Sequence, residues 1–351
     1  MTRSSPSRAR ADRASQPSPA APRPRTPAPT PRSRTPARFT VAAFACLYFF
    51  WGSTYTGIHI AGQHLEAPLV GALRTLLTTT LLVLFCLLTG RSLRITRGEA
   101  WRLALIGVLM MSCNNVLLTW AETRVSSGIS SLLVATMPIM VAVIEACLRG
   151  GERLTRRGWV GVALGTLGMA VLVSPTFHRG GAGGTREALA YVVLLIAALA
   201  FAVGAVLGRR FSIARDAFVV TAWEIGAAAI VNTLLALGFG TLHTAVWTRS
   251  GLFAIAYLAV FGSMVGLSCL SYLLQHVPVT KVATYAFVNP IVAVLLGVVL
   301  LGERLHGIEA LGMAIIVASV ALVIFSKVRQ QPSGGAVLEE VATEGPVAAR
   351  G

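Results

Sequence analysis

The sequence predicts an all-α membrane protein with ten transmembrane helices, arranged as two inverted five-helix repeats. The composition is 55% hydrophobic and 13% charged, whereas soluble domains carry about 25% charged residues. The apolar residues form long unbroken blocks, and one pattern of Pro, Gly and Glu occurs twice in the chain. These observations exclude a soluble enzyme, a disordered chain and a secreted disulfide-rich scaffold.

Ten apolar blocks are long enough to span a bilayer, which takes about 20 residues. They cover residues 41–61, 68–88, 103–121, 128–148, 158–174, 188–208, 218–238, 252–274, 281–301 and 307–326. Helix is the expected structure, because the bilayer core offers no partner to free backbone groups. A membrane β-barrel would show alternating segments of about ten residues instead, a pattern that this sequence lacks.

Two polar tails flank the spans, at residues 1–39 and 327–351, and both are expected to be disordered. The first contains nine Pro and nine Arg, and we expect it to contact anionic lipid headgroups. A mitochondrial presequence is also rich in Arg, but the prolines oppose the amphipathic helix that it needs. No motif supports binding of the tail to nucleic acid.

The basic residues predict the orientation of the chain. With the N-terminus inside, the connecting loops on the inner side hold 11 Arg, and those on the outer side hold 5. Because Lys and Arg are concentrated on the cytoplasmic side of membrane proteins, both termini are expected to be cytoplasmic.

The fourth and ninth blocks carry the repeated pattern. Each has a proline in mid-span, Pro138 and Pro290, and each ends in Gly-Glu-Arg-Leu, with Glu152 and Glu303. We expect both prolines to kink their helices. Each unit has five spans, an odd number, so the second must enter the membrane upside down relative to the first. The two units cover residues 40–175 and 187–326.

Several short motifs carry a family resemblance. They are Trp51-Gly52-Ser53-Thr54-Tyr55, Arg74 after Pro68, Asn115 with Ala121-Glu122, Ser127-Gly128-Ile129, Trp223-Glu224, Phe261-Gly262-Ser263 and Tyr285 to Pro290. With the two Pro and Gly-Glu units, they resemble EamA/RhaT-type drug/metabolite transporters, and most closely the YedA-like exporter branch. The resemblance implies ten spans, two repeats, a plasma-membrane location and efflux of small metabolites or drugs.

Two ionisable residues inside spans stand at equivalent positions of the repeats. Arg74 and Glu224 are 150 residues apart, and equivalent positions of inverted copies can meet across the pseudo-two-fold axis. We expect a pair near the midplane that closes the cavity or holds a charged substrate, because ionisable groups in spans are costly and usually functional. The alternative is a permanent ion pair that locks the repeats together.

Three further ionisable residues have more than one interpretation. Glu122 lies two helical turns after Asn115 on the same face, so the two could bind a proton and a polar substrate group. Alternatively, Glu122 lies at the interface and pairs with Arg124. Glu145 is expected to pair with arginines at the cytoplasmic end, and Lys281 to extend to the membrane surface.

Aromatic and amide side chains complete the expected cavity. Trp51, Tyr55 and Tyr285 have amphipathic rings suited to organic substrates, with core packing as the alternative. Asn289 can bond a substrate or a carbonyl that the kink at Pro290 leaves free. Small residues at helical spacing predict close packing of helices, within the chain or between the protomers of a homodimer. They are Gly161, Gly165, Gly168, Ser127, Ser131 and Ala135.

Other chemistry is not indicated. The sequence has no Gly-rich phosphate loop, and its histidines and cysteines are scattered without metal-ligand or redox spacing. We therefore expect neither an enzyme, a cofactor, a metal site nor a nucleic-acid partner. The sequence favours a secondary transporter of the inner or plasma membrane that exports small organic molecules by alternating access, coupled to protons. Glu122 or Glu224 is expected to take up the coupling proton. The alternatives are an importer, and a membrane scaffold or sensor that acts through its basic tail.

Overall fold

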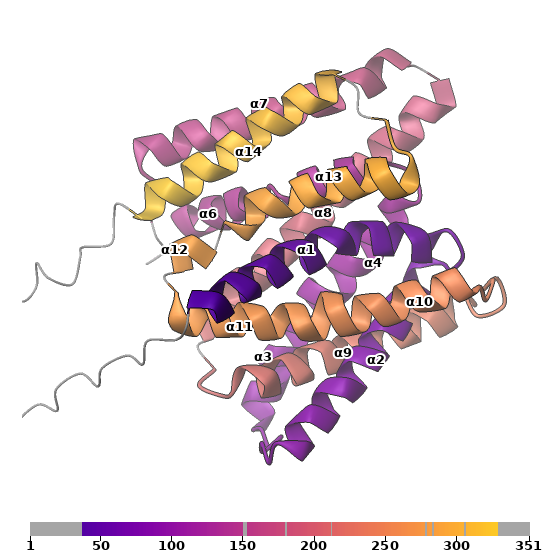
Figure 1. Ribbon diagram of the computed structural model, residues 1–351, viewed down its shortest axis with the longest axis vertical. Helices are drawn as coiled ribbons and strands as arrows, with labels where there is room; N and C mark the ends of the chain where they lie inside the picture. Colours follow the sequence, from indigo (N-terminus) through magenta and orange to yellow (C-terminus); the bar gives the residue numbers. More distant parts are fainter. Residues whose placement is uncertain are drawn as a thin grey trace, which may run out of the picture. The chain divides into compact units, whose positions relative to one another are not determined.

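The computed structural model describes residues 37–149, 153–179, 181–211, 213–277, 279–282, 284–304 and 307–328, and within these ranges the chain is helical and has no strand (Figure 1). The helices are α1 (Ala37–Gly62), α2 (Ala67–Leu88), α3 (Arg97–Gly107), η1 (Val108–Cys113), α4 (Asn114–Glu122), α5 (Ser127–Val134), α6 (Met137–Cys147), α7 (Arg156–Arg179), α8 (Gly181–Phe211), α9 (Ala217–Gly238), α10 (Arg249–Tyr257), η2 (Leu258–Val265), α11 (Gly266–His276), α12 (Val279–Val282), α13 (Tyr285–Leu301) and α14 (Gly307–Val328). The labels η1 and η2 denote π-helical segments. Glu152 and most of the two predicted tails lie outside the described residues.

The described chain contains eight helical segments that are long and apolar enough to cross a membrane. They are Arg38–Gly62, Ala67–Leu88, Arg97–Glu122, Ser127–Cys147, Gly184–Phe211, Ala217–Gly238, Arg249–Leu270 and Gly307–Phe325. Helix α13 is apolar but shorter, and α7 packs along α14. The prediction of an all-α membrane protein with two repeats is confirmed, and the count of ten helices holds approximately.

Local sequence signals begin and end several of these helices. The Thr96 hydroxyl accepts the Glu99 N–H at the start of α3, and the Glu99 carboxylate accepts the Thr96 N–H, which forms a capping box. Gly90 and Gly240 follow the equivalent helices α2 and α9, with φ of 68° and 65°. Glycine adopts this left-handed conformation without the steric cost of a side chain, so both helices end in the same way.

The pairing of equivalent helices shows that the repeats are inverted. Along α7 and α14, Gly161 lies against Val323, Gly165 against Ser319, Gly168 against Ile316 and Gly312 against Leu172. Positions rise along one helix as they fall along the other, so the two helices are antiparallel (Figure 1). The small-residue stripe of α7 therefore packs on α14 of the same chain, which confirms its interpretation as close helix packing.

Helices α2 and α9 form the second antiparallel pair. Thr79 lies beside Gly226, Asn232 donates a hydrogen bond to Thr75, and the rings of Phe85 and Phe218 are 4.9 Å apart. The first helix of each repeat packs on the other repeat: α1 contacts α10, η2, α11 and α13, whereas α8 contacts α4, η1, α5 and α6. The two repeats thus share one interior.

Helix geometry is interrupted at matching places in both repeats. The π-helical segments η1 and η2 begin at Val108 and Leu258, and each lies in the third helical span of its repeat. π-Helical segments within α-helices occur frequently at functional sites. They place backbone and side-chain groups in the interior at positions that a regular helix would not offer.

The two repeated prolines, Pro138 and Pro290, differ in their local helix structure. The fourth span breaks at Ala135 and Thr136, and Pro138 lies in the first turn of α6. Proline is well tolerated there, because the first N–H groups of a helix have no intrahelical partner. Pro290 lies inside α13, a continuous helix that begins at Tyr285. Both prolines thus lie within their spans, but Pro138 stands beside a break between two helices whereas Pro290 stands inside one helix.

Ion pairs join the repeats at the expected cytoplasmic end. Arg91 pairs with Asp216, and Arg215 pairs with Glu99 at 2.9 Å. Glu145 lies 3.7 Å from Arg209 and 3.6 Å from Arg210. The expected pairing of Glu145 with nearby arginines is thus confirmed, and Lys281 is exposed.

Candidate substrate and proton site

Trp51 fixes the first helix against the second repeat. Its indole N–H donates to the Gly262 carbonyl in η2 at 3.0 Å. Its ring meets the ring of Tyr285 edge-on, with centroids 5.0 Å apart and an interplanar angle of 88°. Gly52 lets α1 approach the Asn289 carbonyl on α13. The Trp-Gly-Ser motif therefore begins one wall of the interior where α1, η2 and α13 meet.

Arg74 lies in the same interior and is held by neutral groups. Its Nη1 donates to Asn115 Oδ1 at 3.2 Å, and its Nε and Nη2 donate to Ser263 Oγ at 3.4 and 3.3 Å. The structure thus brings together Arg74 and Asn115, which the sequence singled out, and adds Ser263. These three side chains come from α2, α4 and η2.

The expected pair between Arg74 and Glu224 is wrong. Glu224 lies on α9, with its backbone carbonyl packed directly against Gly107 of α3. The two repeats are related by a pseudo-two-fold axis in the membrane plane. Equivalent residues therefore lie at opposite depths in the membrane, and they meet only where both are near the axis. Thr75 lies against Asn232, so the position opposite Arg74 on the antiparallel helix α9 is about nine residues from Glu224, or about 13 Å along the helix.

Glu122 is the most unusual polar residue of the site. Its exposure is 0%, and neither carboxylate oxygen has a hydrogen-bond partner among the described residues. Glu303 and Arg74 are the charged groups whose fields act on it, and it lies within electrostatic range of Tyr55. Pairing with Arg124 is excluded, because that guanidinium stacks on Trp120 and donates to the Trp120 carbonyl.

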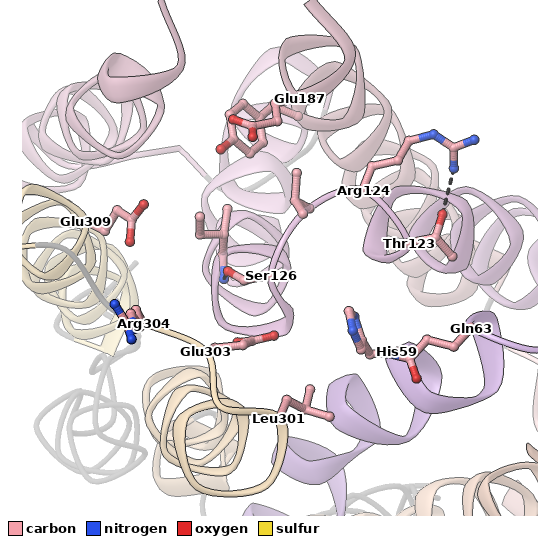
Figure 2. Close-up of a pocket in the computed structure, with 13 residues that line it drawn as sticks. His59, Gln63, Thr123, Arg124, Ser126, Glu187, Leu301, Glu303, Arg304 and Glu309 are labelled. Atoms are coloured by element: carbon pink, nitrogen blue, oxygen red, sulfur yellow. Dashed lines mark hydrogen bonds between the residues drawn. The ribbon is translucent and has the colours of Figure 1, made fainter. Parts of the chain in front are cut away.

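A polar cavity of about 400 Å³ lies where the loop after α4 meets the ends of α1 and α13 (Figure 2). Its lining consists of His59, Gln63, Thr123, Arg124, Val125, Ser126, Ile129, Glu187, Tyr191, Leu301, Glu303, Arg304 and Glu309. The four residues that follow Glu122 are part of this lining, so the buried carboxyl lies close to the cavity. Burial and the neighbouring Arg186 lower the pKa of Arg124.

Glu303 joins the repeats at this cavity. Its carboxylate accepts hydrogen bonds from the Ser127 N–H at 2.7 Å, the Ser127 hydroxyl at 3.1 Å and the Gly128 N–H at 3.3 Å. The second copy of the Gly-Glu motif thus caps the first turn of α5 in the first repeat. The sequence marked Glu303 as part of a repeat, but gave no indication of this partner.

The other expected site residues differ in their burial and in their distance from the cluster around Arg74. Tyr55 and Tyr285 are half-buried and lie within electrostatic range of each other. Asn289 is buried, and its side-chain oxygen has no partner in the described part of the chain. Glu224 lies apart from the cluster around Arg74.

Sequence reasoning did not name the serines of the π-helical segments as site residues, although Ser263 is part of the Phe261-Gly262-Ser263 motif. Ser263 bonds Arg74, and Ser112 of η1 donates to Asn232 of α9 at 2.5 Å. Each serine therefore contacts the second helix of the other repeat. The repeat could have indicated these serines. Ser112 and Ser263 are 151 residues apart, which is also the separation of Glu152 and Glu303.

Comparison with known proteins identifies the family. The model of the EamA-like transporter family matches residues 38–174 and 188–325. The uncharacterized inner membrane transporter YedA of Escherichia coli (strain K12) is 35% identical over 80% of this chain and 89% of its own length. A WAT1-related chloroplastic protein of Arabidopsis thaliana is 25% identical over 79% of this chain and 67% of its own length.

A solved crystal structure shares the fold. It aligns with a TM-score of 0.59 and 19% identity, over 85% of this chain and all of that chain. The two matches of the family model fall on the two inverted halves of the described helices. This chain therefore belongs to the EamA-like transporter family and is a multi-pass membrane transporter.

Proposed function

We propose that the protein is a secondary transporter that exports small organic molecules by alternating access and is coupled to protons. Inverted repeats that share one interior support this mechanism, because each repeat can rock against the other around a common site. The two repeats also contact each other through two antiparallel helix pairs, α2 with α9 and α7 with α14.

One observation carries the proposal: Arg74 and Glu122 are two unpaired ionisable groups in the shared interior. Neither forms an ion pair among the described residues, and Glu122 has no hydrogen-bond partner there. Ionisable groups inside membrane spans are expensive when no opposite charge pairs with them. A transporter has a reason to retain them, because a substrate or a proton completes their interactions during the cycle.

We assign the roles from this geometry. Arg74, Asn115 and Ser263 form the polar part of the substrate site, and Trp51, Tyr55 and Tyr285 form its aromatic wall. Glu122 binds the coupling proton. Glu224, the second proton site that the sequence suggested, is left out because it lies outside this cluster.

The orientation is part of the proposal. The excess of arginine in the loops on one side supports an orientation with both termini in the cytoplasm. The cavity beside Glu122 then faces the outside of the membrane, where protons enter. Export is proposed on the resemblance to the exporter branch, and import is the alternative direction.

The test begins with an export profile. Cells that overproduce the wild-type protein or Glu122→Gln are compared for the metabolites that accumulate outside. Each enriched compound is then tested in proteoliposomes with an imposed pH gradient. We expect Glu122→Gln to reduce flux that depends on the pH gradient by about tenfold or more, because an amide cannot take up the proton.

Glu224→Gln is the matched control, since it removes a half-buried carboxylate from the other repeat. It should keep a flux close to that of the wild type. Gradient-dependent flux at the wild-type rate in Glu122→Gln would remove Glu122 as the proton site. A wild-type protein whose overproduction enriches no external compound, and that transports none in vesicles, would contradict export.

A further inference from the structure

Arg74 is a cation whose bonding partners in the described chain are all neutral. Its three hydrogen bonds go to the Asn115 amide oxygen and the Ser263 hydroxyl. No carboxylate among the described residues lies within ion-pair distance of it. An arginine that only locks helices together would be expected beside a carboxylate, because an ionisable group inside a membrane span is costly unless it is paired.

The partners of Arg74 are themselves held in place. Asn115 donates its amide N–H to the Met111 carbonyl at 2.9 Å, and Ser263 donates its hydroxyl to the Leu258 carbonyl at 3.1 Å. Both side chains therefore direct an oxygen at the guanidinium. The Leu258 carbonyl is within reach because Ser263 lies in the π-helical segment η2.

The guanidinium has donors to spare. Arginine carries five N–H groups, and three of them are used, one each on Nε, Nη1 and Nη2. One N–H on Nη1 and one on Nη2 have no partner among the described residues. Two such donors suit a group with two acceptor oxygens, such as a carboxylate or a phosphate.

We propose that the substrates carry an anionic group, a carboxylate or a phosphate monoester, that docks on Arg74. The organic part of the substrate lies against Trp51, Tyr55 and Tyr285. This inference rests on the proposed transport function and names the substrate class for the same site. When the coupling proton neutralises Glu122, the positive charge of Arg74 remains available to the anionic group.

Binding to the full-length protein in detergent tests the substrate class without a gradient. The probes are matched series that share one body: phenylacetate, phenylacetamide and phenethylamine, and phenyl phosphate with phenol. Bound ligand raises the unfolding temperature. We expect at least one anion to raise it, and the neutral and cationic counterparts to have little effect. The carboxylate and phosphate arms show which anion is preferred.

Two variants test the role of Arg74. Arg74→Gln removes the cation, and Asn115→Asp supplies a carboxylate at the atom that now lies 3.2 Å from Nη1. Asn115→Asp keeps the size of the side chain, and the ion pair that it forms with Arg74 should offset the lost hydrogen bond to the Met111 carbonyl, so that the variant folds. We expect both variants to weaken anion binding by about tenfold or more, as the loss of a charge-assisted contact implies.

Arg97→Gln is the control, because it removes an exposed arginine and changes the net charge equally. It should bind the anion as the wild type does. The proposal is overturned if no anion stabilises the protein beyond its neutral counterpart, or if Asn115→Asp binds the anion with unchanged affinity. These experiments measure binding and not flux. They therefore test the substrate class independently of the transport assay.

Discussion

At the scale of single residues, Trp51 shows how one side chain joins two repeats. Its indole N–H is satisfied by a carbonyl of η2, and its ring lies against Tyr285 of α13. The indole fits because Gly266 has no side chain: a Cβ there would overlap Trp51 Nε1. A buried Trp N–H needs a partner, so packing and hydrogen bonding fix the same rotamer.

The substitution Gly266→Ala should displace this indole. We expect a loss of about 1–3 kcal/mol in stability, the usual cost of overpacking a core, together with reduced transport. Thermal unfolding in detergent measures the loss. Gly238→Ala is the control, because a Cβ at that position meets no atom within 4 Å. Equal unfolding temperatures for the two variants would show that the indole is not confined by Gly266.

Sequence reasoning worked best for charged residues. Arg74 and Glu122 stood out because ionisable groups are rare in apolar spans, and both prove to lie in the shared interior. Ser263 was noted only as part of a family motif and not as a site residue, since a serine hydroxyl in a helix can bond a nearby backbone carbonyl. Its contact with Arg74 depends on the π-helical geometry of η2, which no single residue of the sequence predicts.

At the scale of helices, the Gly-Glu motif acts through its backbone as well as its side chain. Gly302 follows α13 with φ of 66°, and the Glu303 N–H donates to the Gly297 carbonyl at 3.0 Å. This turn directs the Glu303 carboxylate at the start of α5. Negative charge at a helix N-terminus is favourable, and the first N–H groups of α5 need acceptors.

Removing this cap should loosen the first turn of α5. We expect Glu303→Ala to cost about 1–3 kcal/mol and to speed hydrogen exchange at the Ser127 and Gly128 amides, as measured by mass spectrometry. Glu66→Ala serves as the control, because Glu66 is exposed and bonds the Thr244 hydroxyl across a surface loop. If both variants exchange at the wild-type rate in α5, the cap does not stabilise the helix.

At the scale of the whole molecule, inversion decides which residues can meet. Equivalent helices pair in opposite directions, so a residue near the N-terminus of α2 lies opposite a residue near the C-terminus of α9. This explains why Arg74 and Glu224 stand apart despite their equivalent positions. It also explains why Glu303, in the second repeat, reaches α5 in the first.

A designed disulfide tests this antiparallel arrangement. A Cβ built on Gly165 would lie 3.6 Å from Ser319 Cβ, within the range of about 3.5–4.5 Å that a disulfide needs. With the five native cysteines replaced by Ala, Gly165→Cys with Ser319→Cys should cross-link on mild oxidation. Mass spectrometry of peptides would detect the bond. The tip of the Ile139 side chain, 2.5 Å from the same Cβ, can rotate away.

The pair Gly165→Cys with Gly312→Cys is the control. Gly312 lies against Leu172, which is about 10 Å further along α7 at 1.5 Å per residue. This pair should remain reduced under the same conditions. Cross-linking of the control pair alone would contradict the antiparallel register of α7 and α14.

The sequence by itself determined the membrane class, the helical composition and the two repeats, because these follow from local properties. Apolar length requires helices in lipid, and an odd number of spans requires inversion. It also singled out Arg74, Asn115 and Glu122, since polar groups in apolar blocks are visible without a structure.

The tertiary structure alone decided which of those groups share a chamber. The pseudo-two-fold axis sets the depth of each residue, the π-helical segments set the direction of Ser112 and Ser263, and the turn at Gly302 sets the partner of Glu303. Each of these contacts joins residues of different repeats. Long-range contacts depend on how helices pack together, and spacing along one chain does not encode that packing directly.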